Sequence, residues 1–318
     1  MKKKKNNVAI QILAGVICVV GIIIFGEFYD NGDISLPDAL KNTDPIIQSN
    51  NTINKDIVDG ELVVDFIDVG QGDSILIRQG EYTMLIDGGT SVCRDDLLNF
   101  LSQEGIDRFE YLIGTHAHED HIGSLDDVVN TYDFDTILFP KVTATTKTFE
   151  NLVLAVQNKD KKFTTPVSGT VYELGDATFE ILAPNSAEYT SANDYSIVIK
   201  LVYGDNSFIF TGDAESESEK EIIAKGYNLK ADVLKVGHHG STTSTSKTFL
   251  DKVNPEYAVI CVGKDNSYKH PTQTTMNKLK NKNILVYRTD EQGTIRCTSD
   301  GENITFNMEP GTYDYPSK

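Results

Sequence analysis

Three short polar motifs hold all six histidines of the 318-residue chain. The densest is the run Thr115 to His121, THAHEDH, in which three histidines and one aspartate lie within six positions. Imidazole nitrogens and carboxylate oxygens are the ligands that suit zinc, manganese or iron. Histidines that serve packing alone would be scattered along the chain. This spacing predicts a metal-dependent enzyme whose site can hold two ions.

Two neighbouring metal pockets follow from the order of residues in this motif. In an extended segment His116 and His118 project to the same side, and they offer one pocket. The chain then turns into a helix, where Asp120 and His121 offer the other. Asp213, in the run FTGD after an apolar strand, is placed to bridge the two ions. Taken alone, an aspartate at such a position is more often a helix cap.

The other three histidines belong to two further motifs. His238 and His239, in KVGHHGS, follow an apolar strand, and the flanking glycines let the backbone approach a ligand. Adjacent side chains normally point in opposite directions, so we expect one to bind metal and the other to contact substrate or a supporting carboxylate. The sequence leaves open which does which. His270, in YKHP, is either a solvent-exposed loop residue or a group that donates a proton or binds a phosphoryl oxygen. The candidate catalytic residues are Asp120, His239 and His270.

The elements that position these motifs follow from the hydrophobic pattern. Short β-branched runs between glycine turns predict strands, and longer periodic runs predict helices. Strands are predicted at 62–69, 74–77, 82–86, 111–114, 136–139, 170–174, 178–183, 196–203, 208–211, 233–236 and 257–262, with others up to 307. Helices are predicted at 95–103, about 122–131, 215–225, 247–253 and 272–281. Two strand-rich halves with interposed helices predict an α/β fold, an αββα four-layer sandwich in which two mixed sheets pack face to face.

The first sixty residues differ from the rest of the chain. Lys2 to Lys5 form a basic cluster, and Val8 to Phe25 then run without a charge, nearly the length that crosses a hydrocarbon core. We expect residues 1–28 to be a basic cytoplasmic tip and a single transmembrane anchor in the cell membrane, 29–60 a flexible acidic stalk, and 61–318 an extracytoplasmic hydrolase domain. The alternative is a cleaved signal peptide and a secreted protein, although no small-residue cleavage pattern follows the apolar run.

The charged residues of the chain limit the kinds of partner that it can bind. Without Lys2 to Lys5 the chain has 25 basic against 47 acidic residues, a formal charge of −22. Such a charge is a poor electrostatic match for general nucleic-acid binding and weighs against a nuclease. Beyond the apolar segment there are three cysteines, an odd number that offers no disulfide framework.

The motifs resemble the metallo-β-lactamase superfamily, whose H-x-H-x-D-H signature is matched by residues 116–121. With DVGQGDS at 68–74, IDGG at 86–89, TGD at 211–213 and HHGS at 238–241, they resemble the hydrolase domain of ComEC-type competence DNA-uptake proteins. The resemblance implies the αββα fold, two divalent ions, zinc or manganese, and hydrolysis of phosphodiester or related bonds by a metal-activated hydroxide. It also implies that Asp87 supports the site from behind a ligand. Asp73 is expected to shape the adjoining loop, or to be a plain turn residue.

One departure from the family pattern concerns the first pocket. The lone histidine expected between the first cluster and the bridging aspartate is absent, and NDYS at 193–196 stands in that interval. We therefore expect the pocket of His116 and His118 to be weak, completed by water, or filled by Asn193 or Asp194. A single apolar segment of adequate length predicts one tether and does not imply DNA translocation.

The expected function is a membrane-tethered phosphodiesterase or nuclease whose substrate is DNA or a surface polymer. The first alternative is a surface-polymer phosphodiesterase such as a phosphorylcholine esterase, which an anchored acidic enzyme would suit. The second is a metal-binding surface module without turnover. The missing histidine disfavours β-lactam hydrolysis. The sequence permits no inference of a protein partner.

Overall fold

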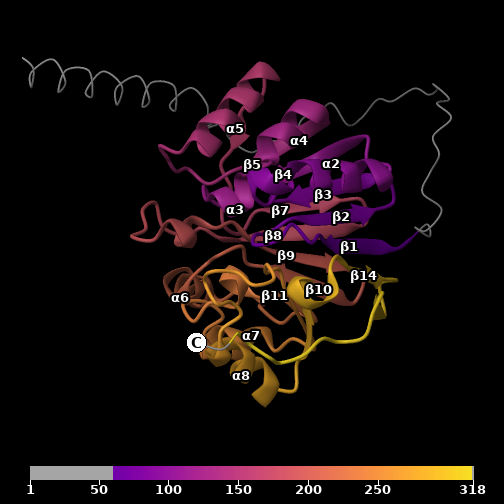
Figure 1. Cartoon of the computed structure of the whole chain (residues 1–318), viewed down its shortest axis with the longest axis vertical. Helices are drawn as coiled ribbons and strands as arrows, with labels where there is room; N and C mark the ends of the chain where they lie inside the picture. Colours follow the sequence, from indigo (N-terminus) through magenta and orange to yellow (C-terminus); the bar gives the residue numbers. More distant parts are fainter. Residues whose placement is uncertain (1–59, 317–318) are drawn as a thin grey trace, which may run out of the picture.

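A computed structural model describes residues 60–316, and these form four layers, with two sheets between two groups of helices (Figure 1). The first sheet has the spatial order β15 (Ile304–Phe306), β14 (Ile295–Ser299), β1 (Leu62–Phe66), β2 (Ile75–Gln79), β3 (Tyr82–Ile86), β4 (Arg108–Ile113), β5 (Asp133–Leu138) and β6 (Phe163–Thr164). The second has the order β13 (Leu285–Arg288), β12 (Tyr257–Ile260), β11 (Val233–Lys235), β10 (Asn206–Phe210), β9 (Val198–Tyr203), β8 (Ala177–Ala183) and β7 (Val171–Leu174). Both sheets mix parallel and antiparallel pairs. The predicted αββα sandwich is confirmed.

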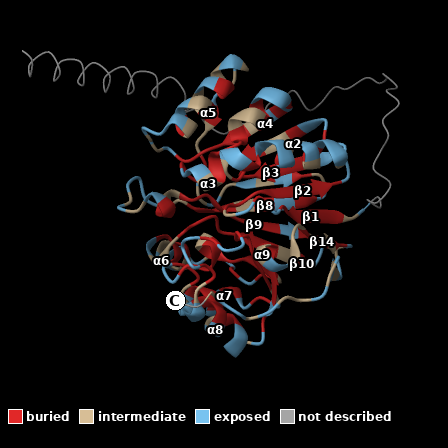
Figure 2. Ribbon diagram, in the orientation of Figure 1, coloured by how far each residue is buried: buried red, intermediate tan, exposed pale blue. Residues whose placement is uncertain are grey.

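The helices lie on the outer faces of the two sheets. Those of the first half are α2 (Arg94–Gln103), α3 (Glu119–Ile122), α4 (Leu125–Thr131) and α5 (Lys147–Asn158). Those of the second half are α6 (Ser216–Lys225), α7 (Lys247–Val253), α8 (Gln273–Asn281) and α9 (Thr289–Gln292). Short 3-10 turns are η2 (Ser91–Cys93), η3 (Ala192–Tyr195) and η4 (Gly237–Gly240). In each helical layer the exposed residues face outward and the buried residues face the sheets (Figure 2).

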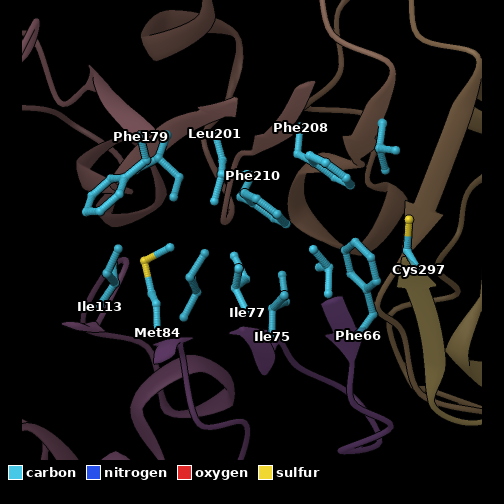
Figure 3. Packing of buried hydrophobic residues seen from close by; sticks show 14 of the residues in the cluster. Phe66, Ile75, Ile77, Met84, Ile113, Phe179, Leu201, Phe208, Phe210 and Cys297 are labelled. Carbon is cyan, nitrogen blue, oxygen red and sulfur yellow. The ribbon is translucent and has the colours of Figure 1, made fainter. Parts of the chain in front are cut away.

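Alternation along the strands builds the core between the sheets. Successive side chains of a strand point to opposite faces, so alternate residues reach the same layer. On β10, Phe208 and Phe210 enter the inter-sheet core, while Ile209 between them packs under the outer helices. In Figure 3 Phe179, Leu201 and both phenylalanines of β10 face the side chains of the first sheet. Because both faces of both sheets are covered, the central strands read as nearly continuous apolar runs.

The helix predictions need two corrections. No helix or strand was predicted between residues 139 and 170, but α5 lies in this interval. Thr146 caps this helix by accepting a hydrogen bond from the Phe149 N–H, and Phe149, Leu152 and Val156 form its buried stripe. The helix predicted at about 122–131 is divided into α3 and α4, because Gly123 and Ser124 separate them.

The N-terminal predictions concern residues that the structure does not describe. The expected anchor and the stalk up to residue 59 lie outside the described residues. Within residues 60–316, none of the helices has the length and apolar character that a membrane span requires.

Candidate metal centre

The predicted site residues come together where loops from both halves of the sandwich meet. The motif 116–121 follows β4, Asp213 follows β10, and His238 and His239 follow β11. Asp87 follows β3 directly. The carboxyl ends of parallel strands are a common location of active sites in α/β proteins, because loops at one edge of the sheet converge there. The metal motif therefore lies at a strand-to-helix turn, as predicted.

One group of potential ligands is formed by Asp120, His121, Asp213 and His239, whose ligand atoms all lie within 4.8 Å of one another. His121 Nε2 lies 3.2 Å from Asp213 Oδ1, and His239 Nε2 lies 3.5 Å from the same oxygen and 3.3 Å from Asp120 Oδ2. Ligands arranged tetrahedrally at about 2.0 Å from one zinc ion lie ~3.3 Å apart. These separations therefore fit one small cation.

The hydrogen bonding of this group supports the same conclusion. His121 Nε2, His239 Nε2 and Asp213 Oδ1 are buried and find no hydrogen-bond partner within the described residues. Most buried polar side-chain atoms are hydrogen-bonded, because leaving them unpaired costs about 1–3 kcal/mol each. Three orphaned atoms at such short separation are explained if a divalent ion binds between them.

The second nitrogen of each of these rings is fixed from behind. His121 Nδ1 lies 2.8 Å from Asp87 Oδ2, and His239 Nδ1 lies 2.8 Å from the carbonyl oxygen of Cys261. A ring that donates its Nδ1 proton there turns the Nε2 lone pair toward the centre. Asp87 is held in turn by Thr115, whose N–H and hydroxyl each donate to it at 2.7 Å. Asp87 thus stands behind a potential ligand, as the resemblance implies.

Asp213 presents its other oxygen to a second group of nitrogens. Its Oδ2 lies 3.6 Å from His238 Nε2 and 4.0 Å from His116 Nε2. His116 Nε2 also lies 3.0 Å from His118 Nδ1. The two oxygens of one carboxylate are therefore divided between two neighbouring sets of histidine nitrogens. This is the arrangement that a bridging carboxylate requires.

His238 and His239 do not point to opposite sides, as adjacent residues of an extended chain do. Both adopt left-handed conformations in η4, with φ of 50° and 52°. The turn brings His239 Nε2 toward one oxygen of Asp213 and His238 Nε2 toward the other. The separate roles expected for these residues rested on extended geometry, which the backbone does not have here.

His238 faces the pocket of His116 and His118, where Asn193 or Asp194 was expected. Asp194 is a helix cap, because its Oδ1 accepts the N–H groups of Glu215 and Ser218 at the start of α6. The Asn193 side-chain amide lies 3.2 Å from Glu215 Oε1 and 3.4 Å from His238 Nδ1. Asp194 therefore does not complete the pocket, and Asn193 stands behind His238. The nitrogen that faces the pocket at this side belongs to His238.

Lys235 is a buried member of the site that the sequence analysis missed. It is fully buried, its Nζ forms an ion pair with Asp73, and it donates to the Gly212 carbonyl oxygen at 2.9 Å. Asp73 Oδ1 also lies 3.4 Å from His239 Nδ1. Burial lowers the pKa of Lys235, but Asp73 raises it above its ordinary value, so the amine is charged. A lysine that ends the apolar strand β11 was the available signal, because buried lysines are almost always paired.

Carboxylates control the protonation of the centre. Burial opposes a charge on Asp213, yet the neighbouring His121 and His239 hold its pKa well below the ordinary value. Burial also opposes a charge on His121, but Asp213 and Asp87 raise the pKa of this ring well above normal. Burial and the neighbouring His121 instead hold the pKa of His116 well below normal. A metal ion binding at His121 and His239 would displace protons, since a coordinating imidazole must be neutral.

His270 lies at the edge of the centre, in a loop. Only 9% of it is exposed, and its ring centroid lies 5.6 Å from that of His238. Burial and the nearby His238 lower its pKa to about 4, so the imidazole is neutral at neutral pH. Its Nδ1 is buried without a hydrogen-bond partner in the described part of the chain. The reading of His270 as a solvent-exposed loop residue is wrong, because its loop folds back over His238.

Comparisons with known proteins indicate the family of the chain. Residues 67–264 match the metallo-beta-lactamase superfamily. ComE operon protein 3 of Bacillus subtilis (strain 168) is 34% identical over 265 residues, which cover 78% of this chain and 34% of that protein. Competence protein ComA of Neisseria gonorrhoeae is 30% identical over 242 residues, which cover 76% of this chain and 33% of that protein. The chain spans about a third of the length of these relatives.

A solved structure shares the fold. A metallo hydrolase from the hyperthermophilic archaeon Ignicoccus hospitalis aligns with a TM-score of 0.50 and 13% identity, over 74% of this chain and 98% of that one. The predicted resemblance to competence proteins of the ComEC type is confirmed by the curated relatives. The fold, the clustered ligands and the matched residues together establish that the chain belongs to the metallo-β-lactamase superfamily.

Proposed function

We propose that the chain is a metal-dependent phosphodiesterase that acts on DNA and binds two divalent ions, zinc or manganese. The observation that carries this proposal is the division of Asp213 between two sets of nitrogens, one with His121 and His239 and the other with His116 and His238. Paired ions about 3.5–4 Å apart are typical of phosphatases and nucleases. Such a pair supplies a nucleophile from water at neutral pH and neutralises charge on the phosphodiester.

The side chains around this centre have distinct tasks in the proposed reaction. Asp120, with 26% of its side chain exposed, is the most accessible carboxylate of its group and orients the attacking water. Asp213 holds the two sets of ligands at a fixed separation. His270, with His238 beside it, lies where its neutral ring can donate a hydrogen bond to a phosphoryl or leaving oxygen. His239 is a ligand in this scheme, because its two nitrogens are directed to the centre and to the Cys261 carbonyl oxygen.

DNA is favoured as the substrate by the names of the relatives. One is named ComE operon protein 3, another is named Competence protein ComA, and a third, 34% identical over 238 residues, is Recombination protein 2 of Haemophilus influenzae. The formal charge of −18 is the observation that favours a second candidate, a phosphodiesterase acting on a surface polymer that carries cationic groups such as choline. Turnover of a choline phosphodiester in preference to DNA would support this second candidate.

The proposed location is the cell membrane, with residues 1–28 as an anchor and residues 61–318 outside the cytoplasm. The basic residues Lys2 to Lys5 before an uncharged run support this orientation. In untreated cells the hydrolase domain should be found in the membrane fraction. Protease added to intact cells should digest it. Recovery of the domain in the culture medium would instead indicate a cleaved signal peptide.

Hydrolysis of a chromogenic phosphodiester, bis(p-nitrophenyl) phosphate, tests the reaction class. The full chain in mild detergent, supplied with manganese or zinc, should release nitrophenol, and a chelator should stop the reaction. The Asp120→Ala variant should be inactive while its circular dichroism spectrum is unchanged. The matched control is Glu119→Gln, because the Glu119 carboxylate bonds Ser91 and belongs to neither ligand set.

The results of this assay distinguish a phosphodiesterase from a metal-binding module without turnover. Metal-dependent turnover by the parent and by Glu119→Gln, with none by Asp120→Ala, supports the proposal. Metal binding without turnover of any phosphodiester would leave a metal-binding surface module. Full activity of Asp120→Ala would place the chemistry elsewhere.

A further inference from the structure

A stack of rings leads from the metal centre to the surface. His238 Nε2 lies 3.6 Å from Asp213 Oδ2, and the His238 ring meets His270 edge-on at a centroid distance of 5.6 Å. Tyr268 then stacks on His270, with centroids 5.9 Å apart and ring planes inclined by 26°. Tyr268 is 64% exposed, so it ends the stack in solvent. The role assigned to the centre does not require such an exposed aromatic ring.

The loop that carries this ring, residues 263–271, is held in a defined shape. The Asn266 side-chain amide donates to the carbonyl oxygens of Gly263 and His270, and its oxygen accepts the His270 N–H. Gly263 N–H also donates to Gln71 Oε1, which ties the loop to the first half of the fold. A ring presented on a fixed loop loses little conformational freedom on binding, which favours its use as a binding platform.

The same loop carries positive charge on an acidic protein. Lys264 and Lys269 are exposed and flank Tyr268 in sequence. Neither lysine forms an ion pair with any residue in the described range 60–316. Asp265 is the loop's single carboxylate, so the segment 263–271 is net positive where the chain as a whole is strongly negative. Unpaired lysines beside an exposed aromatic ring are the pattern of single-strand nucleic-acid binding sites.

A groove near this loop bears on the path that a bound nucleic-acid strand would take. It has a volume of about 560 Å³, is lined in part by Lys264 and Asn266, and does not include Tyr268. Its walls also carry four carboxylates, Asp68, Asp96, Asp290 and Glu291. Like charges would repel a polyanion there. The favourable path is therefore over Tyr268.

We infer that Tyr268 is a stacking platform for a nucleobase, with Lys264 and Lys269 contacting phosphates, and that the substrate at this site is single-stranded nucleic acid. This inference rests on the proposed function, because it places the strand beside a phosphodiesterase centre. Every base offers a π-face, so the platform recognises a strand without reading its sequence. It also gives a local explanation of how an acidic protein can hold a polyanion. A double helix hides its base faces and would gain less from Tyr268.

The test compares a fluorescein-labelled oligothymidylate with an abasic strand of equal length, which keeps the phosphates and lacks the bases. Binding is measured by fluorescence anisotropy with the full chain in detergent and manganese, in the Asp120→Ala background so that nothing is cleaved. Tyr268→Ala should weaken binding of the thymidine strand about tenfold and leave the abasic strand unchanged. Tyr268→Phe should bind like the parent. The control Tyr82→Ala removes another exposed tyrosine, 48% exposed, and should change nothing.

The lysines are tested with the same two strands. Lys264→Ala and Lys269→Ala should weaken both strands alike, and each should lower the slope of log affinity against log salt by about 0.7. The control Lys162→Ala removes an exposed lysine of the other half and should leave both strands unaffected.

Failure of this inference is distinguishable from failure of the proposed function. Equal binding of both strands by the parent, or an unchanged Tyr268→Ala variant, overturns the stacking platform even if bis(p-nitrophenyl) phosphate is hydrolysed. A Tyr268→Ala variant that loses only turnover of a choline phosphodiester also overturns it, because the ring would then bind a cation. Loss of the thymidine preference in Tyr268→Ala supports it even if no turnover is detected.

Discussion

The metal centre and a second buried group, the arginine cluster, both place charges inside the protein, but they differ in balance. The arginine cluster consists of Asp65, Arg78, Glu104 and Arg296. Its ion pairs measure 2.6–2.8 Å, and two arginines meet two carboxylates. The metal centre gathers four carboxylates, Asp73, Asp87, Asp120 and Asp213. They outnumber one lysine, Lys235, and two imidazoles, His121 and His239, whose pKa values they raise.

This difference indicates which cluster serves structure and which serves binding. A balanced buried cluster joins strands and has nothing left to offer a ligand. An excess of buried carboxylates is destabilising unless a cation offsets it, and such stored cost is common at functional sites. The two clusters should therefore respond differently when a carboxylate is removed, because a histidine can release its proton and an arginine cannot.

Asp213→Asn should produce the largest change. We expect turnover of bis(p-nitrophenyl) phosphate to fall at least about 1000-fold, since the amide cannot bridge two ions. The metal-free variant should nevertheless lose less stability than removal of a partner of an arginine costs, because His121 and His239 can release the protons that Asp213 holds on them. Urea unfolding in the presence of a chelator measures this. A metal-free variant that loses several kcal/mol would show that the centre is structural, and the comparison would fail.

Asp65→Asn should lower the stability of the fold and leave the activity unchanged. Removing one partner of a buried ion pair costs about 3–5 kcal/mol, because Arg78 and Arg296 keep their charges without it. The free energy of unfolding should fall by that amount, while turnover per folded molecule stays the same. The control is Asp251→Asn, an exposed carboxylate that pairs with Lys247 and Lys282, which should leave the urea midpoint nearly unchanged. Lost activity in the folded Asp65→Asn variant would link the two clusters.

Lys235→Met should give the smallest effect and sharpen the comparison inside the centre. Loss of this ammonium group should destabilise the metal-free protein by about 2 kcal/mol, because Asp73 loses its buried ion-pair partner. Adding Asp73→Asn should restore most of the stability, as a double-mutant cycle of urea unfolding would reveal. Additive losses would mean that the short contact between the two side chains carries no coupling.

Much of the fold could be predicted from local patterns. Alternating apolar residues such as Phe208 and Phe210 located the strands, and the order of elements predicted the layers. Helix α5 was missed although its stripe of Phe149, Leu152 and Val156 has helical spacing. Its cap at Thr146 was a further local signal that was not used. The missed helix was therefore readable from the sequence.

The centre was predictable in composition and less so in geometry. The dense motif at 116–121 predicts the types of ligand, because its residues are close together in the sequence. The pairing of Asp73 with Lys235 joins residues about 160 positions apart, and only the packed sheets bring them together. The direction of His238 depends on two consecutive left-handed residues, a conformation that non-glycine residues rarely adopt. Tertiary packing decided both features.

The loops that form the centre come from both halves of the chain, and this has a consequence for unfolding. His121 and His239 are about 120 residues apart in sequence, and Cys93, Cys261 and Cys297 are all free thiols. An ion held by both histidines would close a loop of that length, as a disulfide does, and restrict the unfolded chain. It would act as a removable cross-link, so chelation should speed the separation of the two halves, and ion release should accompany their opening.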